Sequence, residues 1–284
     1  MKLVRYGAIG KEKPGLIDPN GALRDLSSIV QDIDAQTLAR EGRARLAAID
    51  PQTLPLVSDE QRYGAPVAHV SKFICVGLNY SEHAAETGAP IPEQPILFMK
   101  ATSAITGPND DVIIPQGSVK TDWEVELGVV IGETARSVSI DNALSHVAGY
   151  VVVNDLSERE FQLEHGGQWV KGKSCDTFGP IGPWLVTAEE VPDPQNLGLW
   201  LEVNGHRYQN GNTRTMIFGV AHLVSYISRY MTLLPGDVIS TGTPSGVGLG
   251  LKPPVYLRPG DVVELGIDGL GQQRQHFRAH SNNP

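Results

Sequence analysis

Residues 122–132, with the sequence DWEVELGVVIG, read as one β-strand that carries two carboxylates in an apolar run. Because alternate residues of a strand point to the same face, Glu124 and Glu126 are expected side by side, roughly 6–7 Å apart. If both are ionised and shielded from water, their repulsion is on the order of 2–3 kcal/mol. The pair therefore needs solvent, a shared proton, basic side chains or a divalent cation. The plain alternative is an exposed edge strand, where charged side chains are common.

A third carboxylate, Asp155, follows the apolar segment YVVVN. Functional sites are often assembled where buried strands end, although Asp155 could equally be the N-cap of a following helix. With Glu124 and Glu126 it makes a set of three oxygen ligands without sulfur. Such a set favours Mg²⁺, Mn²⁺ or Ca²⁺ and disfavours structural zinc.

A histidine and a glutamate in NYSEHAAETG have the spacing of neighbours on a helix. We expect a short helix capped by Ser81 and ended by Gly88, in which Glu86 orients His83 as a general base. The alternative is an exposed helical ion pair of little energetic value. The proline-rich residues 89–95 that follow are typical of a loop, and helix and loop together suggest a lid.

Several cationic and polar residues are candidates for binding an anionic substrate. Lys171 and Lys173 lie in a Gly/Pro-rich stretch, with Arg159 and Gln162 upstream, and the residues alone do not decide between the two lysines. The glycine-rich STGTPSGVGLG offers backbone N–H groups to an anion, and Thr243 within it offers a hydroxyl. It has neither the P-loop ending nor a GxGxxG pattern, which disfavours nucleotide binding.

Composition narrows the class of protein. The net charge of −9 and the lack of Lys/Arg runs disfavour a nucleic-acid partner. No apolar segment reaches about 18 residues, which predicts no membrane span, no signal peptide and a cytoplasmic location. Gly 31 and Pro 20 in 284 residues favour a β-rich fold with many turns. Cys75 and Cys175 fit no metal-binding spacing, so we expect two reduced core thiols.

The pattern divides the chain into a small N-terminal domain, residues 1–69, and a catalytic region, residues 70–284. In the first part, residues 34–49 are predicted to form one helix with Asp34 as its N-cap. In the second, Asn204 and Gly205 predict a type I′ hairpin turn. Residues 218–231 give the clearest amphipathic helix.

Six segments, in this order, resemble the fumarylacetoacetate hydrolase family: GLNYSEHAAE, DWEVELGVVIG, YVVVNDLSEREFQ, KGKSCDTFGPIGPWL, NGHRYQNGNTRTMIF and LLPGDVISTGTPSGVG. The likeness covers residues 70–277. It implies a mixed α/β, β-rich fold with a β-sandwich or β-roll core, a homodimer and Mg²⁺ as the metal. The N-terminal MKLVRYG and EKPGLID resemble bacterial members that act on sugar acids.

The resemblance also assigns roles. It implies metal ligation by the three carboxylates and prefers Lys173 over Lys171 as the active-site lysine. Where animal members have a further metal-site aspartate, this chain has Val76, so three carboxylates are expected. Asp122 has no counterpart in the motifs and is given no role. The expected site is therefore His83 and Glu86 as base and partner, Lys173, metal ligands Glu124, Glu126 and Asp155, and substrate contacts Gln162, Thr243 and Arg159.

The implied activity is that of a hydrolase acting on carbon–carbon bonds in ketonic substances. Its expected substrate is a small 2,4-diketo-3-deoxy sugar acid, L-fuconate or L-rhamnonate derived, cleaved between C3 and C4 to pyruvate and lactate. Alternatives on the same site are an acylpyruvate hydrolase, an oxaloacetate decarboxylase or tautomerase, and a hydroxyhepta-diene-dioate isomerase. A non-catalytic cation-binding protein is disfavoured, because it would not need His83 and Glu86.

Overall fold

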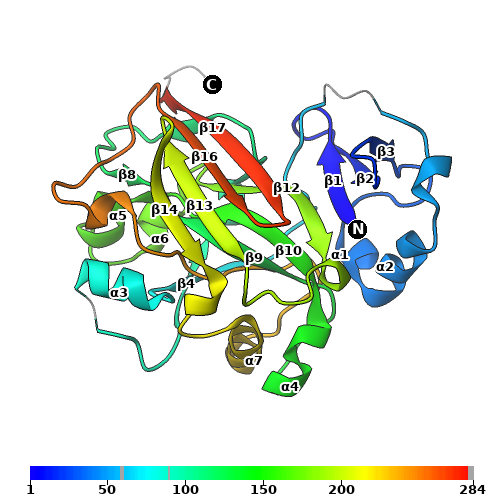
Figure 1. Ribbon diagram of the computed structural model, residues 1–284. Helices are drawn as coiled ribbons and strands as arrows, with labels where there is room; N and C mark the ends of the chain where they lie inside the picture. The colour runs from blue at the N-terminus through cyan, green and yellow to red at the C-terminus, as the bar shows by residue number, and fades with distance from the viewer. Residues whose placement is uncertain (58–60, 89, 281–284) are drawn as a thin grey trace.

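The computed structural model describes residues 1–57, 61–88 and 90–280 as a strand-rich mixed α/β structure (Figure 1). The expected fold class is confirmed. Its largest sheet contains, in spatial order, β3 (Leu23–Asp25), β2 (Lys13–Ile17), β1 (Lys2–Tyr6), β12 (Gly179–Thr187), β10 (Val147–Asn154), β9 (Val125–Ile131), β15 (Val238–Ser240), β4 (Phe73–Gly77) and β5 (Ile96–Lys100), with β6 (Ile105–Thr106) beside β12.

Two further sheets complete the described strands. One has the order β14 (His206–Asn212), β13 (Gly198–Val203), β16 (Val262–Ile267), β17 (Gly271–Ala279) and β7 (Val112–Ile114). The other pairs β8 (Thr121–Asp122) with β11 (Ser157–Glu158). In Figure 1 the long strands β13, β14, β16 and β17 lie in front of β9 and β10.

The helices are short and lie around the sheets (Figure 1). The α-helices are α1 (Ala35–Leu38), α2 (Arg40–Ala47), α3 (Ser81–Thr87), α4 (Ile140–Ala143), α5 (Arg159–Leu163), α6 (Val170–Lys173) and α7 (Val220–Tyr230). The 3₁₀ turns are η1 (Pro51–Thr53), η2 (Thr102–Ala104), η3 (Leu144–His146), η4 (Ala188–Glu190), η5 (Thr213–Thr215) and η6 (Gly248–Gly250). No helix within the described residues combines the length and apolar character that crossing a membrane needs.

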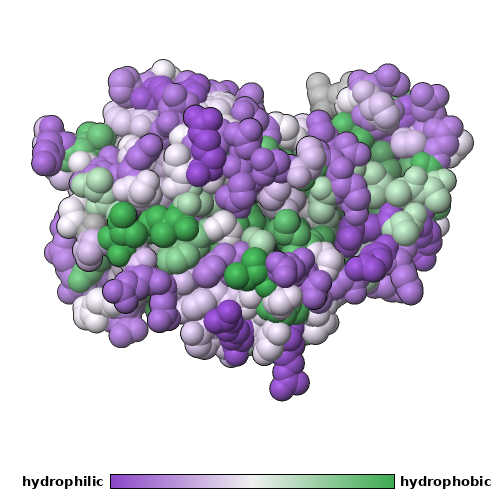
Figure 2. Space-filling view, turned by 60° about the horizontal axis from the view of Figure 1, so that its bottom comes forward, coloured by the Kyte–Doolittle hydropathy of each residue, from purple (hydrophilic) through white to green (hydrophobic). Residues whose placement is uncertain are grey.

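The surface that carries α3, α4 and α7 is mainly hydrophilic, with apolar side chains gathered in patches (Figure 2). Exposed apolar residues on the helices of this side include Ile140 and Tyr230. The rest of the apolar residues are mostly internal, in two large clusters on either side of the ten-stranded sheet.

Strand β9 lies inside the sheet, between β10 and β15, and all of its residues are buried. The exposed-edge interpretation of its carboxylates is therefore wrong. Val125, Leu127 and Val129 enter one apolar cluster, whereas Val130 enters the other. Glu126 lies four positions before Val130, and because this offset is even, its side chain points to the second face. One carboxylate thus lies on a face that is otherwise core.

Residues 122–132 do not form the single strand that the pattern predicts. The ladder of β8 ends at Asp122 and that of β9 begins at Val125. Between them, side chains replace strand carbonyls as acceptors: Asp122 Oδ1 accepts from Trp123 N at 2.8 Å, and Gln209 Oε1 accepts from Val125 N at 2.9 Å. One partner is the preceding residue and the other is distant in sequence, and both satisfy the backbone where the ladder is interrupted.

The predicted helix over residues 34–49 is two helices. Asp34 is the N-cap and accepts from Thr37 N at 3.0 Å, as predicted, but Ala39 is extended and separates α1 from α2. The two helices approach so closely that a Cβ at Gly42 would strike the carbonyl oxygens of Gln36 and Thr37. The close approach at this glycine fixes the break.

Other local predictions are mixed. Ser81 is the first residue of α3 and not its cap; the cap is Tyr80, which makes no side-chain capping bond. Gly88 ends α3 with φ 68°, as predicted. Asn204 and Gly205 have φ of 51° and 78°, which confirms the type I′ turn. The amphipathic helix is confirmed as α7.

The N-terminal strands continue the main sheet. Strand β1 pairs antiparallel with β12, with Lys2 opposite Val186. Figure 1 shows β1, β2 and β3 with α1 and α2 on one side of the molecule. The sheet therefore runs from the N-terminal region to the strands of the site, and the division at residues 69 and 70 stays a prediction.

The pairing of β10 with β12 requires a glycine at position 149. A Cβ there would strike Val186 O and would lie 2.8 Å from Leu185 Cδ2. We expect Gly149→Ala to lower the free energy of unfolding by about 1–3 kcal/mol, as overpacking does. Urea unfolding followed by circular dichroism measures this change. Asn142→Ala, at an exposed position, is the control and should change it by less than about 0.5 kcal/mol. Equal values for the two variants would contradict the argument.

Candidate active site

Three carboxylates meet where β9 and β10 lie side by side. Glu126 belongs to β9, Glu124 directly precedes β9, and Asp155 directly follows β10. One oxygen of each lies within 4.8 Å of the others, and all three residues are buried. Asp155 N also donates to Glu124 O at 2.9 Å, which holds the two segments in register. Asp155 is not a helix cap, because Glu158 caps α5.

Basic side chains neutralise part of this cluster. Lys173 Nζ lies 2.6 Å from Glu124 Oε2 and 3.0 Å from Asp155 Oδ2. Arg159 Nη2 donates to Glu124 Oε1 at 2.7 Å. Lys171 is exposed and donates to the carbonyl of His165 instead, so only Lys173 of the two lysines reaches the carboxylates.

The carboxylates differ in their electrostatic environment. Burial acts to raise the pKa of Glu124, but the charges of Lys173 and Arg159 outweigh it and lower that pKa to about 2. Burial, together with the neighbouring Asp155 and Glu124, raises the pKa of Glu126 well above its usual value. Glu126 Oε2 accepts from Ser240 Oγ at 2.6 Å and is in no ion pair of the described residues.

This donor set fits a hard divalent cation. The three carboxylates are buried together, and the negative charge of Glu126 is opposed by burial and by its two acidic neighbours. An ion such as Mg²⁺ or Mn²⁺ prefers oxygen ligands and would offset that repulsion. The three carboxylates can therefore hold a metal ion, with Glu124, Glu126 and Asp155 as its ligands.

His83 and Glu86 lie beside the carboxylates on α3. His83 Nδ1 is 3.3 Å from Glu86 Oε2, and His83 is buried, with 7% of its surface exposed. The interpretation as an exposed surface ion pair is therefore wrong. Glu86 also accepts from Gly246 N, at 2.9 Å through Oε1 and 3.1 Å through Oε2. The same carboxylate orients the imidazole and attaches α3 to the glycine-rich segment.

Four backbone amides between residues 242 and 249 donate to the chain's own carboxylates. Gly242 N donates to Glu126 at 2.8 Å, Gly246 N to Glu86, and Gly248 N to Asp122 at 2.7 Å. At these positions the amides are occupied by the protein's own carboxylates and are not free for an anionic substrate, contrary to the expectation.

A pocket of about 290 Å³ opens onto these groups. Gln162 is buried in its lining and accepts from Arg159 Nη1 at 3.1 Å through Oε1. Thr243 Oγ1 donates to Val125 O at 2.9 Å and accepts from Gln209 Nε2 at 2.8 Å. The polar part of the lining is His83, Glu124, Glu126, Arg159, Gln162, Lys173 and Thr243. The structure thus places seven of the nine expected site residues around one cavity, with Glu86 and Asp155 directly behind them.

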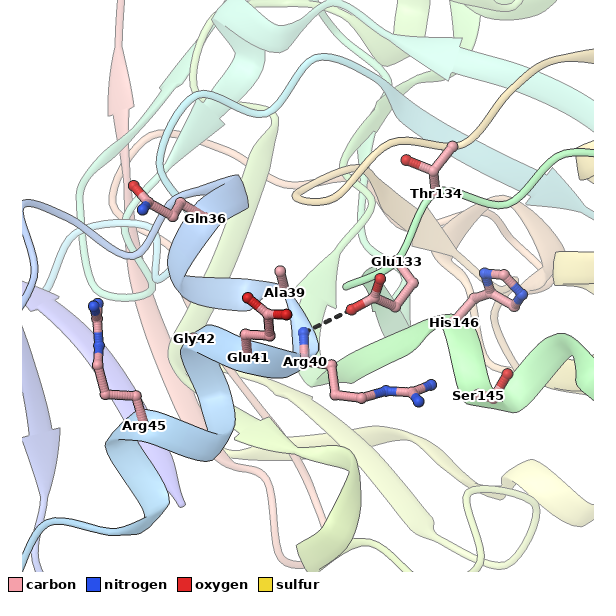
Figure 3. Close-up of a pocket in the computed structure, with 10 residues that line it drawn as sticks. All are labelled: Gln36, Ala39, Arg40, Glu41, Gly42, Arg45, Glu133, Thr134, Ser145 and His146. Atoms are coloured by element: carbon pink, nitrogen blue, oxygen red, sulfur yellow. Dashed lines mark hydrogen bonds between the residues drawn. The ribbon is translucent and has the colours of Figure 1, made fainter.

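A larger hollow of about 760 Å³ lies between α2 and the residues beyond β9 (Figure 3). Glu133 Oε1 there accepts from Arg40 N at 2.6 Å, and Arg45 projects away from Glu133 (Figure 3). Its charged groups, of both signs, do not converge on one point. The smaller pocket, with its converging carboxylates and histidine, is therefore the better candidate for chemistry.

Two buried residues of the site were given no role by the sequence. Asp122 Oδ2 accepts from Arg159 Nε at 2.8 Å, so it holds the guanidinium that binds Glu124. Lys100 Nζ lies 2.6 Å from Asp155 Oδ1 and donates to the carbonyl of Lys173 at 2.6 Å. Asp122 lies two positions before Glu124, just as Glu124 lies two before Glu126, and this spacing could have indicated that Asp122 belongs to the site. Lys100 only ends an apolar strand, ILFMK, and that signal is weak.

Comparison with known proteins shows the family of the chain. The C-terminal domain of fumarylacetoacetate hydrolase matches residues 72–278. The chain belongs to the fumarylacetoacetate hydrolase family. A curated relative from Burkholderia lata, named provisionally as a hydrolase, is 65% identical over 279 residues, which are 98% of this chain and 99% of the relative.

Solved structures of the family are similar along nearly the whole chain. A fumarylacetoacetate hydrolase of Exiguobacterium antarcticum has 36% identity and a TM-score of 0.88, with 99% of this chain and 100% of that chain covered. A 2-hydroxyhepta-2,4-diene-1,7-dioate isomerase of Mycobacterium marinum has 33% identity, a TM-score of 0.75 and the same coverage. A maleylpyruvate hydrolase of Sphingobium sp. SYK-6, in complex with manganese(II) and pyruvate, has 27% identity, a TM-score of 0.82 and the same coverage.

Metal binding can be measured without any assay of activity. Saturating Mg²⁺ or Mn²⁺, at about 100 times its dissociation constant, should stabilise the protein by about 2.7 kcal/mol. Glu126→Gln should abolish this stabilisation, because it removes one anionic ligand. Thermal unfolding with and without the ion measures the effect.

Glu264→Gln is the matched control, because Glu264 lies in β16 of the other large sheet and is partly exposed. It should keep the full response to the ion. An equal response in the Glu126 and Glu264 variants would show that the ion binds elsewhere.

Lys100 should contribute strongly to stability. Lys100→Met leaves buried Asp155 with one cation fewer, and breaking a buried ion pair costs about 3–5 kcal/mol. Urea unfolding in EDTA measures the loss. Lys171→Met, which changes an exposed lysine, should alter the free energy of unfolding by less than about 0.5 kcal/mol. If the Lys100 variant is as stable as the Lys171 variant, the buried ion pair of Lys100 with Asp155 does not contribute to stability as argued.

Proposed function

We propose that this protein is a divalent-cation-dependent hydrolase of the C3–C4 bond of a 2,4-diketo acid, with pyruvate as one product. The observation that carries the proposal is the convergence of three buried carboxylates, Lys173 and the His83–Glu86 pair on one pocket. Family membership supports an enzyme, and the maleylpyruvate hydrolase bound to manganese(II) and pyruvate supports this class of product.

His83 acts as the general base in this proposal. In the tautomer that carries its proton on Nδ1, directed at the carboxylate of Glu86, Nε2 is the basic nitrogen that takes a proton from water. The water oxygen forms a bond to C4, the C3–C4 bond breaks, and its electron pair passes to C3, where the C2 carbonyl delocalises it. A proton on C3 completes pyruvate, and C4 leaves as the carboxyl carbon of the second acid.

Lys173 supplies a fixed positive charge and not a base. Burial acts to lower its pKa, but Asp155 and Glu124 outweigh burial and raise it. The ammonium therefore stays protonated beside the carboxylates while negative charge develops on the substrate oxygens. Glu124, Glu126 and Asp155 would hold a divalent cation here, which would supply a Lewis acid for those oxygens. We take Mg²⁺ as the physiological ion, with Mn²⁺ as the substitute that the manganese-bound relative supports.

For the substrate, we propose a 2,4-diketo-3-deoxy sugar acid of the L-fuconate or L-rhamnonate series, which would give pyruvate and lactate. The support is the resemblance of the N-terminal segments to sugar-acid-pathway members. Small-molecule turnover needs no further partner, and the expected homodimer stays a prediction.

Pyruvate release tests the reaction. In an assay coupled to lactate dehydrogenase, wild-type protein with Mg²⁺ should release pyruvate from 2,4-diketo-3-deoxy acids. His83→Ala should lower kcat by about 10²–10⁴-fold, because the base is lost, and should keep the stabilisation by the metal ion. His280→Ala, at an exposed position after β17, is the control and should leave kcat unchanged. Full turnover by His83→Ala would place the base elsewhere.

An isomerase is the second candidate, because the dioate isomerase of Mycobacterium marinum has the same fold. The same site would then move a proton between carbons without water attack on C4. Product analysis separates the two: an isomerase releases no pyruvate and yields a product of unchanged mass.

A further inference from the structure

The pocket has two unlike parts. Besides its carboxylates and basic groups, the lining contains a wall of apolar side chains and backbone, which no part of the proposed chemistry uses. The wall is formed by Val76, Gly77, Leu78, Phe98, Leu163, Trp169 and Leu249.

This wall is built from tight packing. The rings of Phe98 and Trp169 meet edge to face, with centroids 5.3 Å apart. The indole of Trp169 also lies on the backbone of Gly77, where an added Cβ would be 2.6 Å from Trp169 Cζ3. A side chain at position 77 would therefore displace the indole. The fixed aromatic surface is suited to an apolar group of a ligand.

The cations of the pocket already have anionic partners. Arg159 binds Asp122 and Glu124, and Lys173 binds Glu124 and Asp155. Within the described lining of this pocket, no other lysine or arginine is present. A second carboxylate on the substrate, placed against the apolar wall, would lose water. The lysine beside the Phe98 ring is Lys173, with Nζ 5.1 Å from its centroid, and this ammonium is already paired with two carboxylates, which disfavours binding of a third.

We infer that the substrate carries a short, uncharged tail on C4, which binds against the wall of Phe98 and Trp169. This inference rests on the proposed hydrolysis of a 2,4-diketo acid and adds the class of its tail. The volume of about 290 Å³ is at the low end of small-molecule sites, so the tail is a few carbons long. Alkyl and hydroxyalkyl tails fit, and a terminal carboxylate does not.

The test compares two substrates that differ only at the last carbon. 2,4-Dioxoheptanoate ends in a methyl group, and 2,4-dioxoheptanedioate ends in a carboxylate at the same position. Water cleaves the first to pyruvate and butanoate, and the second to pyruvate and succinate, without any other reactant. Both reactions are followed by pyruvate release with wild-type protein and Mg²⁺.

We expect kcat/KM for the heptanoate to exceed that for the heptanedioate by about 10–100-fold or more. Equal values, or a preference for the heptanedioate, would overturn the inference and leave the proposed hydrolysis standing. If the protein cleaves none of these substrates, neither the two dioxo compounds nor the 2,4-diketo-3-deoxy acids, the proposed hydrolysis is refuted, and the inference with it.

A variant tests whether the wall sets this preference. Leu163, at the end of α5, lines the pocket and is partly exposed, at 46%, so a longer side chain can be accommodated there. Leu163→Arg should lower the ratio of the two kcat/KM values by about tenfold or more, because it supplies a cation for the second carboxylate. Leu163→Gln, polar but uncharged, should keep the wild-type ratio. If the two variants have the same ratio of kcat/KM values, a positive charge at position 163 does not affect which tail is selected, and the wall does not set the preference.

Discussion

The buried ion pairs of Lys173 are the interaction on which the rest of the site depends. Its ammonium joins Glu124, which precedes β9, to Asp155, which follows β10. Burying one charged group alone is costly, but these groups are buried together with further hydrogen bonds that compensate the loss of water. The sign and number of charges must therefore be matched across several segments. Lys100 completes the pairing on the far side of Asp155.

The central sheet determines where these charges can be. Antiparallel pairing sets Glu126 opposite Val153, so the start of β9 and the end of β10 are at the same edge of the pleated surface. Along the rest of both strands, apolar residues fill the two faces of the sheet. Rigid strands hold catalytic groups more precisely than loops do. The apolar core is thus what makes the polar cluster both possible and well ordered.

Sequence alone predicted the features that depend on short spacing. Alternation indicated the pairing of Glu124 with Glu126, and helical spacing indicated that of His83 with Glu86. The family resemblance, and not the spacing, selected Lys173. Features set by distant residues were not accessible: Lys100 meets Asp155 across 55 residues of chain, and the acceptor for Val125 N is a side chain from β14. The break at Ala39 was missed because it depends on contacts of Gly42 between two helices.

The glycine-rich segment explains how base and carboxylates keep a common geometry. Its amides bind Glu126 of β9, Glu86 of α3 and Asp122 of β8, so one short stretch of backbone contacts three different elements. Gly246 has φ of 102°, and a Cβ there would strike the carbonyl oxygen of Tyr208, so only glycine permits this approach. Because the segment is fixed by the second large sheet at this point, His83 is positioned relative to the carboxylates by the whole fold and not by α3 alone.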